Sequence, residues 1–270
     1  MFLRQILTRT LGSREAPPAP LPAEVERVIG LLDQDAPTFQ LKSGTESLRS
    51  SEQFLSSRAV RTDEIARGSN ACSSRVLRYI AEITHRGCTS LETGGGWSTC
   101  VFAAVSGKHY CVNPDVTANE MIRGFLRDHS VRHGELVFLD AVSDSALPAL
   151  DRTCVIDVAL IDGNHSFPVP IIDWHYIDLH MKKGGLVLID DTHIQSVRVL
   201  YDYLSTEDSY EKVKDIGALG VFRKTADQRV WGWGDQRFNQ PLVRHGTGYG
   251  KSLRSRFMRY ARKLRGTAAR

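Results

Sequence analysis

The chain has 270 residues, of which 41% are hydrophobic and 24% are charged, and its formal net charge is +4. These values are ordinary for a soluble globular protein, and no apolar run approaches the roughly 20 residues that a membrane-spanning helix needs. The five cysteines are scattered, and no two of them have CxxC spacing. This pattern excludes a disulfide framework and a zinc knuckle, and it predicts reduced thiols in the cytoplasm.

The N-terminal part of the chain, residues 1–69, is predicted to be a helical and irregular extension. Residues 1–14 have the spacing of a short, arginine-rich helix, which is compatible with a packed helix, an organelle transit peptide or an interfacial helix. Four prolines between residues 15 and 22 indicate a linker. Apolar side chains then recur at helical spacing over residues 23–32.

From residue 70 onward the pattern is regular, and helices alternate with strands. The predicted strands are 88–92, 109–113, 135–139, 155–161, 185–190, 211–216 and 219–223. The predicted helices are 73–85, 98–106, 118–133, 169–181 and 196–204. Apolar strands such as Leu186–Ile189 are typical of parallel strands that are covered on both faces. Only Gly217 and Ala218 separate the last two strands, which predicts an antiparallel hairpin.

These elements predict an α/β domain over residues 70–225. Its fold class is a Rossmann-like doubly wound sheet, mostly parallel with a C-terminal antiparallel hairpin, and with helices on both faces. Residues 226–270 form a C-terminal extension, which ends in the basic tail 251–270.

The tail 251–270 holds eight Lys or Arg and no Asp or Glu, so the rest of the chain is net −4. Its apolar residues recur at helical spacing with basic residues between them. Such a helix can contact an anionic membrane or an acidic partner, or bind nucleic acid nonspecifically, and a solvated chain end is the simpler alternative. Nothing indicates specific nucleic-acid recognition, so we expect a cytoplasmic protein that is either free or peripheral at the membrane.

The segment Leu91–Thr99, Leu-Glu-Thr-Gly-Gly-Gly-Trp-Ser-Thr, is the most informative local motif. It predicts a strand, a tight turn and a helix N-terminus, where polar or anionic ligands can approach the backbone. The phosphate-loop pattern is excluded because no Lys follows, and the dinucleotide fingerprint lacks its third glycine. Glu92 at the strand tip would repel a pyrophosphate but attract an amino or hydroxyl group. A turn that only reverses the chain is the alternative.

Polar residues also follow the other predicted strands, at the carboxyl ends where open α/β sheets bind ligands. Because burial of a carboxylate is costly, their convergence indicates a ligand site, although any single residue could cap a helix. These strand ends hold Glu92, Asn113, Asp115, Asp140, Asp162, His165, Asp190, Asp191 and His193.

In combination, these motifs resemble class I S-adenosylmethionine-dependent methyltransferases. The chain is most similar to a group with a Glu-x-Gly-x-Gly-x-Ser-Thr loop, here Glu92–Thr99, and an Ile-Asp-Gly-x-His-Ser segment, here Ile161–Ser166. The same group, which includes metal-dependent O-methyltransferases, has an Asp-Asp pair after the fifth strand, here Asp190 and Asp191. The resemblance covers residues 70–224 and leaves out the N-terminal third and the tail.

The resemblance implies S-adenosylmethionine as the cofactor. Gly94 and Gly96 would let the loop approach the methionine part, and Glu92 would bind its amino group directly or through water. Ser98, at the start of the following helix, is also predicted to bind the cofactor.

For the nucleoside part, Asn113 stands where the family usually has an acidic residue for the ribose hydroxyls. An amide gives up the charge-assisted hydrogen bond there, and Asp115 is the substitute. Ser143 would border the adenine.

The resemblance also implies a divalent cation and a base. Asp162, Asp190 and Asp191 would hold the cation, for which oxygen ligands suit Mg²⁺ best. His165 would be the general base, with His193 as a second candidate, and a turn cap is the alternative for His165.

The leading function is therefore O-methylation of a hydroxylated small molecule or a glycan with divalent-metal assistance. A metal-independent methyltransferase with a nitrogen or carboxylate acceptor is the second interpretation. The third is a non-catalytic tethering or nucleic-acid-binding protein on this fold, whose function would lie in the tail. The sequence is also compatible with a homo-oligomer.

Overall fold

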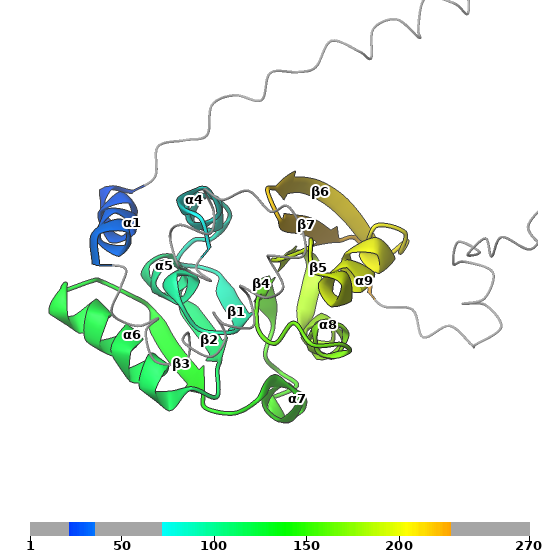
Figure 1. The fold of residues 1–270 in the computed structure, drawn as a ribbon, viewed down its shortest axis with the longest axis horizontal. Coiled ribbons are helices and arrows are strands. Elements are labelled where there is room, and N and C mark those ends of the chain that lie inside the picture. Colours follow the sequence, from blue (N-terminus) through cyan, green and yellow to red (C-terminus); the bar gives the residue numbers. More distant parts are fainter. Residues whose placement is uncertain (1–21, 36–71, 228–270) are drawn as a thin grey trace, which may run out of the picture.

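The computed structural model describes residues 22–35 and 72–227 (Figure 1). The predictions for the N-terminal helix, nearly all of the proline linker and the basic tail lie outside these ranges. Within the described ranges, no helix is both long enough and apolar enough to cross a membrane.

A seven-stranded sheet with the order β3-β2-β1-β4-β5-β7-β6 forms the centre of the fold. The pairs from β3 through β5 are all parallel, and β7 is antiparallel to both β5 and β6. The predicted fold class is therefore confirmed. The strands are β1 (Thr89–Thr93), β2 (Lys108–Val112), β3 (Glu135–Leu139), β4 (Ile156–Ile161), β5 (Met181–Ile189), β6 (Tyr210–Ile216) and β7 (Leu219–Lys224).

Helices cover both faces of the sheet (Figure 1). One layer consists of α1 (Ala23–Asp35), α4 (Ser74–Ile83), α5 (Trp97–Val105) and α6 (Val116–Asp128). The other consists of α7 (Ser143–Ala146), the short 3-10 helix η1 (Leu147–Ala149), α8 (Val169–Asp178) and α9 (Gln195–Leu204).

Strand β4 shows why a central strand is apolar over most of its length. Val158 and Leu160 face the core under α4 and α5, whereas Ala159 and Ile161 face the core under α8 and α9. Successive side chains of a strand point to opposite faces, so consecutive apolar residues are expected where a sheet is covered on both sides.

Two element boundaries differ clearly from the prediction, and one short helix was not predicted. Helix α6 ends at Asp128 because Ser130 adopts a left-handed conformation, with φ of 50°, and turns the chain. Strand β5 already begins at Met181, which the prediction assigned to the preceding helix. Helix α7 was not predicted, because four residues are too few to show a helical apolar period.

Helix α1 lies within the part of the chain that was predicted to be an extension. Its side chains Val25, Val28, Ile29 and Leu32 are buried in the same core cluster as residues of α4 and α5. Arg27 donates a hydrogen bond to the carbonyl of His129 at 3.0 Å, which fixes the helix beside the end of α6. This segment of the N-terminal part therefore contributes to the core of the α/β domain.

Candidate active site

The glycine loop between β1 and α5 lies directly against the end of β4. Gly94 has a φ of 83°, and a Cβ at this residue would lie 2.3 Å from the carbonyl oxygen of Asp162. Among the described residues, no heavy atom lies within 4 Å of a Cβ position at Gly96, which therefore faces open space in this part of the chain. The strand order reverses between β1 and β4, and doubly wound sheets bind ligands at this kind of position.

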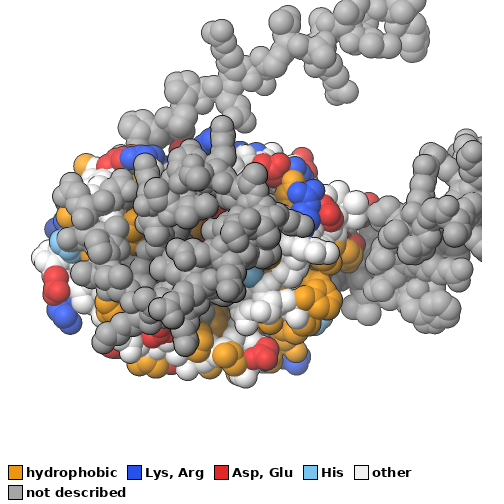
Figure 2. Space-filling view, viewed as in Figure 1, with side chains coloured by type: hydrophobic (Ala, Val, Ile, Leu, Met, Phe, Trp, Pro, Cys, Tyr) orange, Lys and Arg blue, Asp and Glu red, His pale blue; other side chains and the backbone are white. Residues whose placement is uncertain are grey.

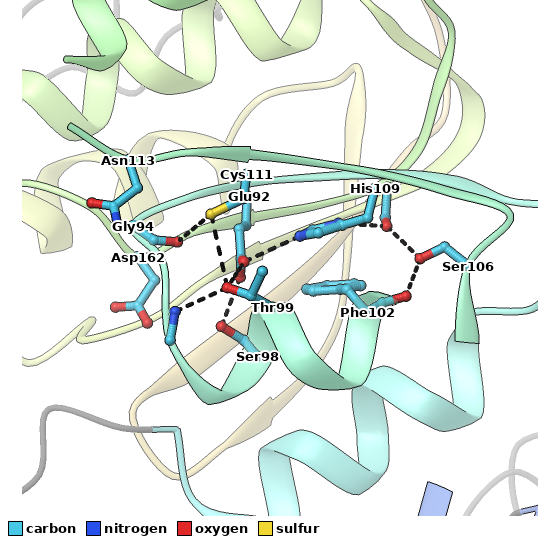
Figure 3. A network of polar contacts seen from close by, with 12 residues as sticks. Glu92, Gly94, Ser98, Thr99, Phe102, Ser106, His109, Cys111, Asn113 and Asp162 are labelled. Atoms are coloured by element: carbon cyan, nitrogen blue, oxygen red, sulfur yellow. Dashed lines mark hydrogen bonds and ion pairs between the residues drawn. The ribbon is translucent and has the colours of Figure 1, made fainter. Parts of the chain in front are cut away.

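A buried polar network supports the loop from beneath (Figure 3). The carboxylate of Glu92 accepts a hydrogen bond of 2.6 Å from Ser98 Oγ and another from Thr99 Oγ1, and it lies 3.1 Å from His109 Nε2. The N–H of Gly96 in turn donates to Thr99 Oγ1 at 2.9 Å. Glu92 is fully buried and Ser98 is 4% exposed. Both therefore hold the loop in place, and the ligand contacts predicted for them stay predictions.

His109 extends this network under α5 and was not singled out by the sequence analysis. Its Nδ1 shares a hydrogen bond of 2.8 Å with Ser90 Oγ, which lies 2.8 Å from Ser106 Oγ. The imidazole stacks on the Phe102 ring at a centroid distance of 4.9 Å. The sequence signal that could have identified His109 was the presence of polar residues in two strands predicted to be buried. These residues are Ser90 and Glu92 in β1 and His109 in β2.

The end of β2 is held by amide groups. Asn113 Nδ2 donates to Asn119 Oδ1 at 2.8 Å, and Asn119 Nδ2 donates to Asp140 Oδ1 at 2.8 Å. Asp115 caps α6 by accepting a hydrogen bond of 3.0 Å from the Ala118 N–H. The ribose contacts predicted for Asn113 and Asp115 stay predictions.

Ser143 begins α7 and is partly exposed at the end that follows β3. The adenine contact predicted for it is also untested.

The carboxylates after β4 and β5 converge on His165. Its Nε2 lies 3.4 Å from Asp191 Oδ2 and 3.7 Å from Asp162 Oδ1, but it makes no hydrogen bond of good geometry within the described part of the chain. Ser196 Oγ donates a hydrogen bond to the His165 carbonyl and fixes this turn to α9. His193 is more exposed and lies 3.6 Å from Asp191 Oδ1.

The three carboxylates predicted as metal ligands are distributed over two groups that share Asp162. One group contains Asp162, His165 and Asp191, and the other contains Asp162, Asp190 and Cys72. In each group the ligand atoms lie within 4.8 Å of one another. Cys72 was not assigned to the site by the sequence analysis, because it lies on a different segment, before α4.

The carboxylates of this cluster shift one another's pKa values. Burial raises the pKa of Asp162 to about 7, to which the charges of Asp190 and Asp191 contribute, while the nearby His165 imidazole, 3.7 Å away, opposes the increase. Burial and the charge of Asp191 also raise the pKa of Asp190, and Asp162 raises the pKa of His165. A cation at this position would offset the mutual repulsion of the carboxylates.

Residues 91–192 match the family model described as a methyltransferase domain. The matched range runs from the glycine loop to the carboxylates after β5. No curated protein matches the chain. The match and the fold support an S-adenosylmethionine-dependent methyltransferase as the enzyme class, with S-adenosylmethionine as its cofactor.

Several solved structures have a similar fold. A methyltransferase from Geobacter sulfurreducens is 16% identical, covers 78% of this chain and 99% of its own, and has a TM-score of 0.47. A Corynebacterium glutamicum protein is 12% identical over 67% of this chain and 99% of its own, with a TM-score of 0.49. An rRNA methylase from Streptococcus thermophilus is 16% identical over 57% and 96% of the two chains, with a TM-score of 0.44.

Proposed function

We propose that this chain transfers the methyl group of S-adenosylmethionine to a hydroxyl oxygen of a small molecule or a glycan, with assistance from a divalent cation. The observation that carries this proposal is the contact between Gly94 and the Asp162 backbone. It places a glycine loop of the type that lets a cofactor approach directly beside a group of carboxylates and a histidine.

The residues present fit a cofactor at the loop. Gly96 leaves open space, whereas Gly94 and Gly95 pack against the ends of β4 and β2 and fix the loop. When it is bound, S-adenosylmethionine supplies an activated methyl group. The chain contributes a rigid loop, because Glu92 and Thr99 hold its far end.

His165 is suited to accept the proton of the acceptor hydroxyl. Its Nε2 has no hydrogen-bond partner in the described residues, and Asp191 and Asp162 lie close enough to stabilise the imidazolium that forms. A divalent cation on the neighbouring carboxylates would lower the pKa of that hydroxyl. Bound beside the loop, S-adenosylmethionine would supply the methyl group, and His165 would hold the proton that the acceptor hydroxyl gives up.

Calorimetry with S-adenosylmethionine tests the proposed cofactor site. We expect one binding site, and we expect Gly96→Ala to weaken binding about tenfold or more, because the added methyl group enters the space left for the ligand. The φ of Gly96 is −175°, an extended value that alanine also adopts, so the unfolding free energy should change little. Gly124→Ala in α6, remote from the loop, is the matched control and should keep the wild-type affinity.

A chain that binds no S-adenosylmethionine, with or without a divalent cation, would contradict the proposal. If the cofactor binds and methyl transfer survives chelation of divalent cations, the metal-independent alternative holds instead.

A further inference from the structure

Cys72 lies against two of the three carboxylates in the candidate active site. Its Sγ is 3.4 Å from Asp190 Oδ2 and 3.7 Å from Asp162 Oδ2, and the residue is only 6% exposed. A thiol carries one hydrogen and can donate it to only one of these oxygens. Hydrogen bonding by the thiol alone therefore does not account for both contacts.

The separations match those between ligands of one cation. Bonds of about 2.3 Å to sulfur and about 2.0 Å to oxygen, at a tetrahedral angle, put the two ligand atoms about 3.5 Å apart. The observed contacts of Cys72 therefore fit a tetrahedral site with sulfur.

The two carboxylate oxygens of Asp162 face different side chains. Oδ2 faces Cys72, whereas Oδ1 faces His165. The imidazole Nε2 is buried without a hydrogen bond in the described residues, next to Asp191. A cation between Cys72, Asp162 and Asp190 would leave His165 free to accept a proton, with Asp191 beside it.

No Lys or Arg of the described ranges forms an ion pair with the carboxylates of this cluster. Within the described ranges, Asp162 and Asp191 pair only with the imidazoles of His165 and His193. A divalent cation would supply the positive charge that these buried and half-buried carboxylates otherwise lack.

We propose that Cys72, Asp162 and Asp190 bind one thiophilic divalent cation of the Zn²⁺ or Co²⁺ type, in place of the Mg²⁺ that the sequence predicts. Thiolate is a soft ligand that favours such ions, whereas Mg²⁺ prefers oxygen. On binding, the Cys72 thiol releases its proton to solvent and its sulfur donates an electron pair to the cation. Three protein ligands leave a fourth position for water or an acceptor oxygen. The inference rests on the proposed function for the role of the cation, and it is argued from the ligand atoms of Cys72, Asp162 and Asp190.

Cobalt titration of the full chain, after removal of bound metals with a chelator, tests this inference. We expect one equivalent of Co²⁺ to produce a thiolate-to-cobalt charge-transfer absorption in the near ultraviolet. Cys72→Ser should abolish that absorption and weaken Zn²⁺ binding by about tenfold or more. Cys154→Ser is the matched control, because Cys154 is a free, half-buried cysteine outside both candidate groups, and it should keep the signal.

The wild-type spectrum gives a result even if Cys72→Ser fails to fold, and Asp190→Asn provides a second variant that keeps the thiol and should weaken binding of Zn²⁺. Binding of Co²⁺ without the charge-transfer absorption, tighter binding of Mg²⁺ than of Zn²⁺, or no binding of any of these ions would each overturn the inference. Calorimetry with S-adenosylmethionine on the same sample separates the two proposals. Cofactor binding without a thiolate-bound cation contradicts only this inference, whereas a thiolate-bound cation without cofactor binding contradicts only the proposed function.

Discussion

Two buried carboxylates in this domain have opposite environments. Glu92 has three side-chain partners, whereas neither carboxylate oxygen of Asp173 in α8 has a hydrogen-bond partner among the described residues. Both residues are fully buried. Burial raises the pKa of Asp173, although Ser143 and Thr93 lie near enough to oppose the increase. A partnered carboxylate fixes its surroundings, while an unpartnered one carries an uncompensated desolvation cost.

We expect Asp173→Asn to raise the free energy of unfolding at pH 7 by about 1 kcal/mol, because the neutral amide costs less to bury. The pKa of Asp173 is higher in the folded than in the unfolded state, so the folded state holds the proton more tightly. Its ionisation therefore lowers stability as the pH rises from the unfolded pKa through the folded pKa. The stabilisation by Asn should accordingly shrink below the unfolded pKa. Urea denaturation at several pH values measures both effects.

Asp128→Asn is the control for this experiment, since the side chain of Asp128 is 68% exposed and its pair with Arg127 lies at the surface. It should change the unfolding free energy by less than about 0.5 kcal/mol at any of these pH values. An Asp173→Asn protein that is less stable than the wild type at pH 7 would show that the charged form has a partner that the described residues do not supply.

At the scale of elements, periodicity predicted long elements well and short or locally terminated ones poorly. The apolar spacing of residues 23–32 predicts α1, but the spacing alone does not show what this helix packs against. The structure places Val28 and Ile29, both fully buried, in the core beside α4 and α5. Packing of α1 therefore joins a segment near the N-terminus to the domain, across residues 36–71.

We expect Ile29→Ala to lower the free energy of unfolding by about 2–5 kcal/mol, because it leaves a cavity in this core. Gly30→Ala is the neighbouring control. A Cβ at Gly30 meets no atom within 4 Å, so alanine should raise stability by about 0.5–1 kcal/mol through its higher helix propensity. Urea denaturation of both variants measures the difference. Equal stability of Ile29→Ala and the wild type would mean that α1 does not dock on α5 in solution.

At the scale of the whole molecule, the charge is divided between the domain and the tail. The chain without residues 251–270 is net −4, and the tail carries the basic excess. In the space-filling view, charged side chains of both signs are interspersed around the visible rim of the domain (Figure 2). Around this visible rim, charges of one sign do not gather into a large patch (Figure 2).

We expect removal of residues 251–270 to leave S-adenosylmethionine affinity unchanged, since the described site lies at the ends of β1, β4 and β5. The same truncation should abolish binding to vesicles that contain anionic lipid, and added salt should weaken vesicle binding of the full chain. Calorimetry and vesicle sedimentation measure the two effects. A truncated chain that keeps its vesicle affinity would place the membrane contact elsewhere, and one that loses the cofactor would place the tail in the site.

The sequence by itself determined the fold class, and it predicted which polar residues lie at the ends of the strands. Apolar strands, a two-residue hairpin turn and polar residues at strand ends are local patterns, and parallel strands necessarily bring their carboxyl ends to one edge of the sheet. Glu92, Asp162, His165, Asp190 and Asp191 could therefore be selected before their positions were known.

Only the tertiary structure decided how these groups are paired. Glu92 is turned into the domain toward His109, and Cys72 reaches the carboxylates of Asp162 and Asp190, although it is 90 and 118 residues away from them in sequence. Such contacts depend on side-chain direction and on how helices pack over the sheet, and neither leaves a periodic signal in the chain. The polar residues of the candidate site could be selected from the sequence because topology fixes where the strands end. The proposed metal ligands could not all be selected, because Cys72 lies on another segment and reaches the site only through packing.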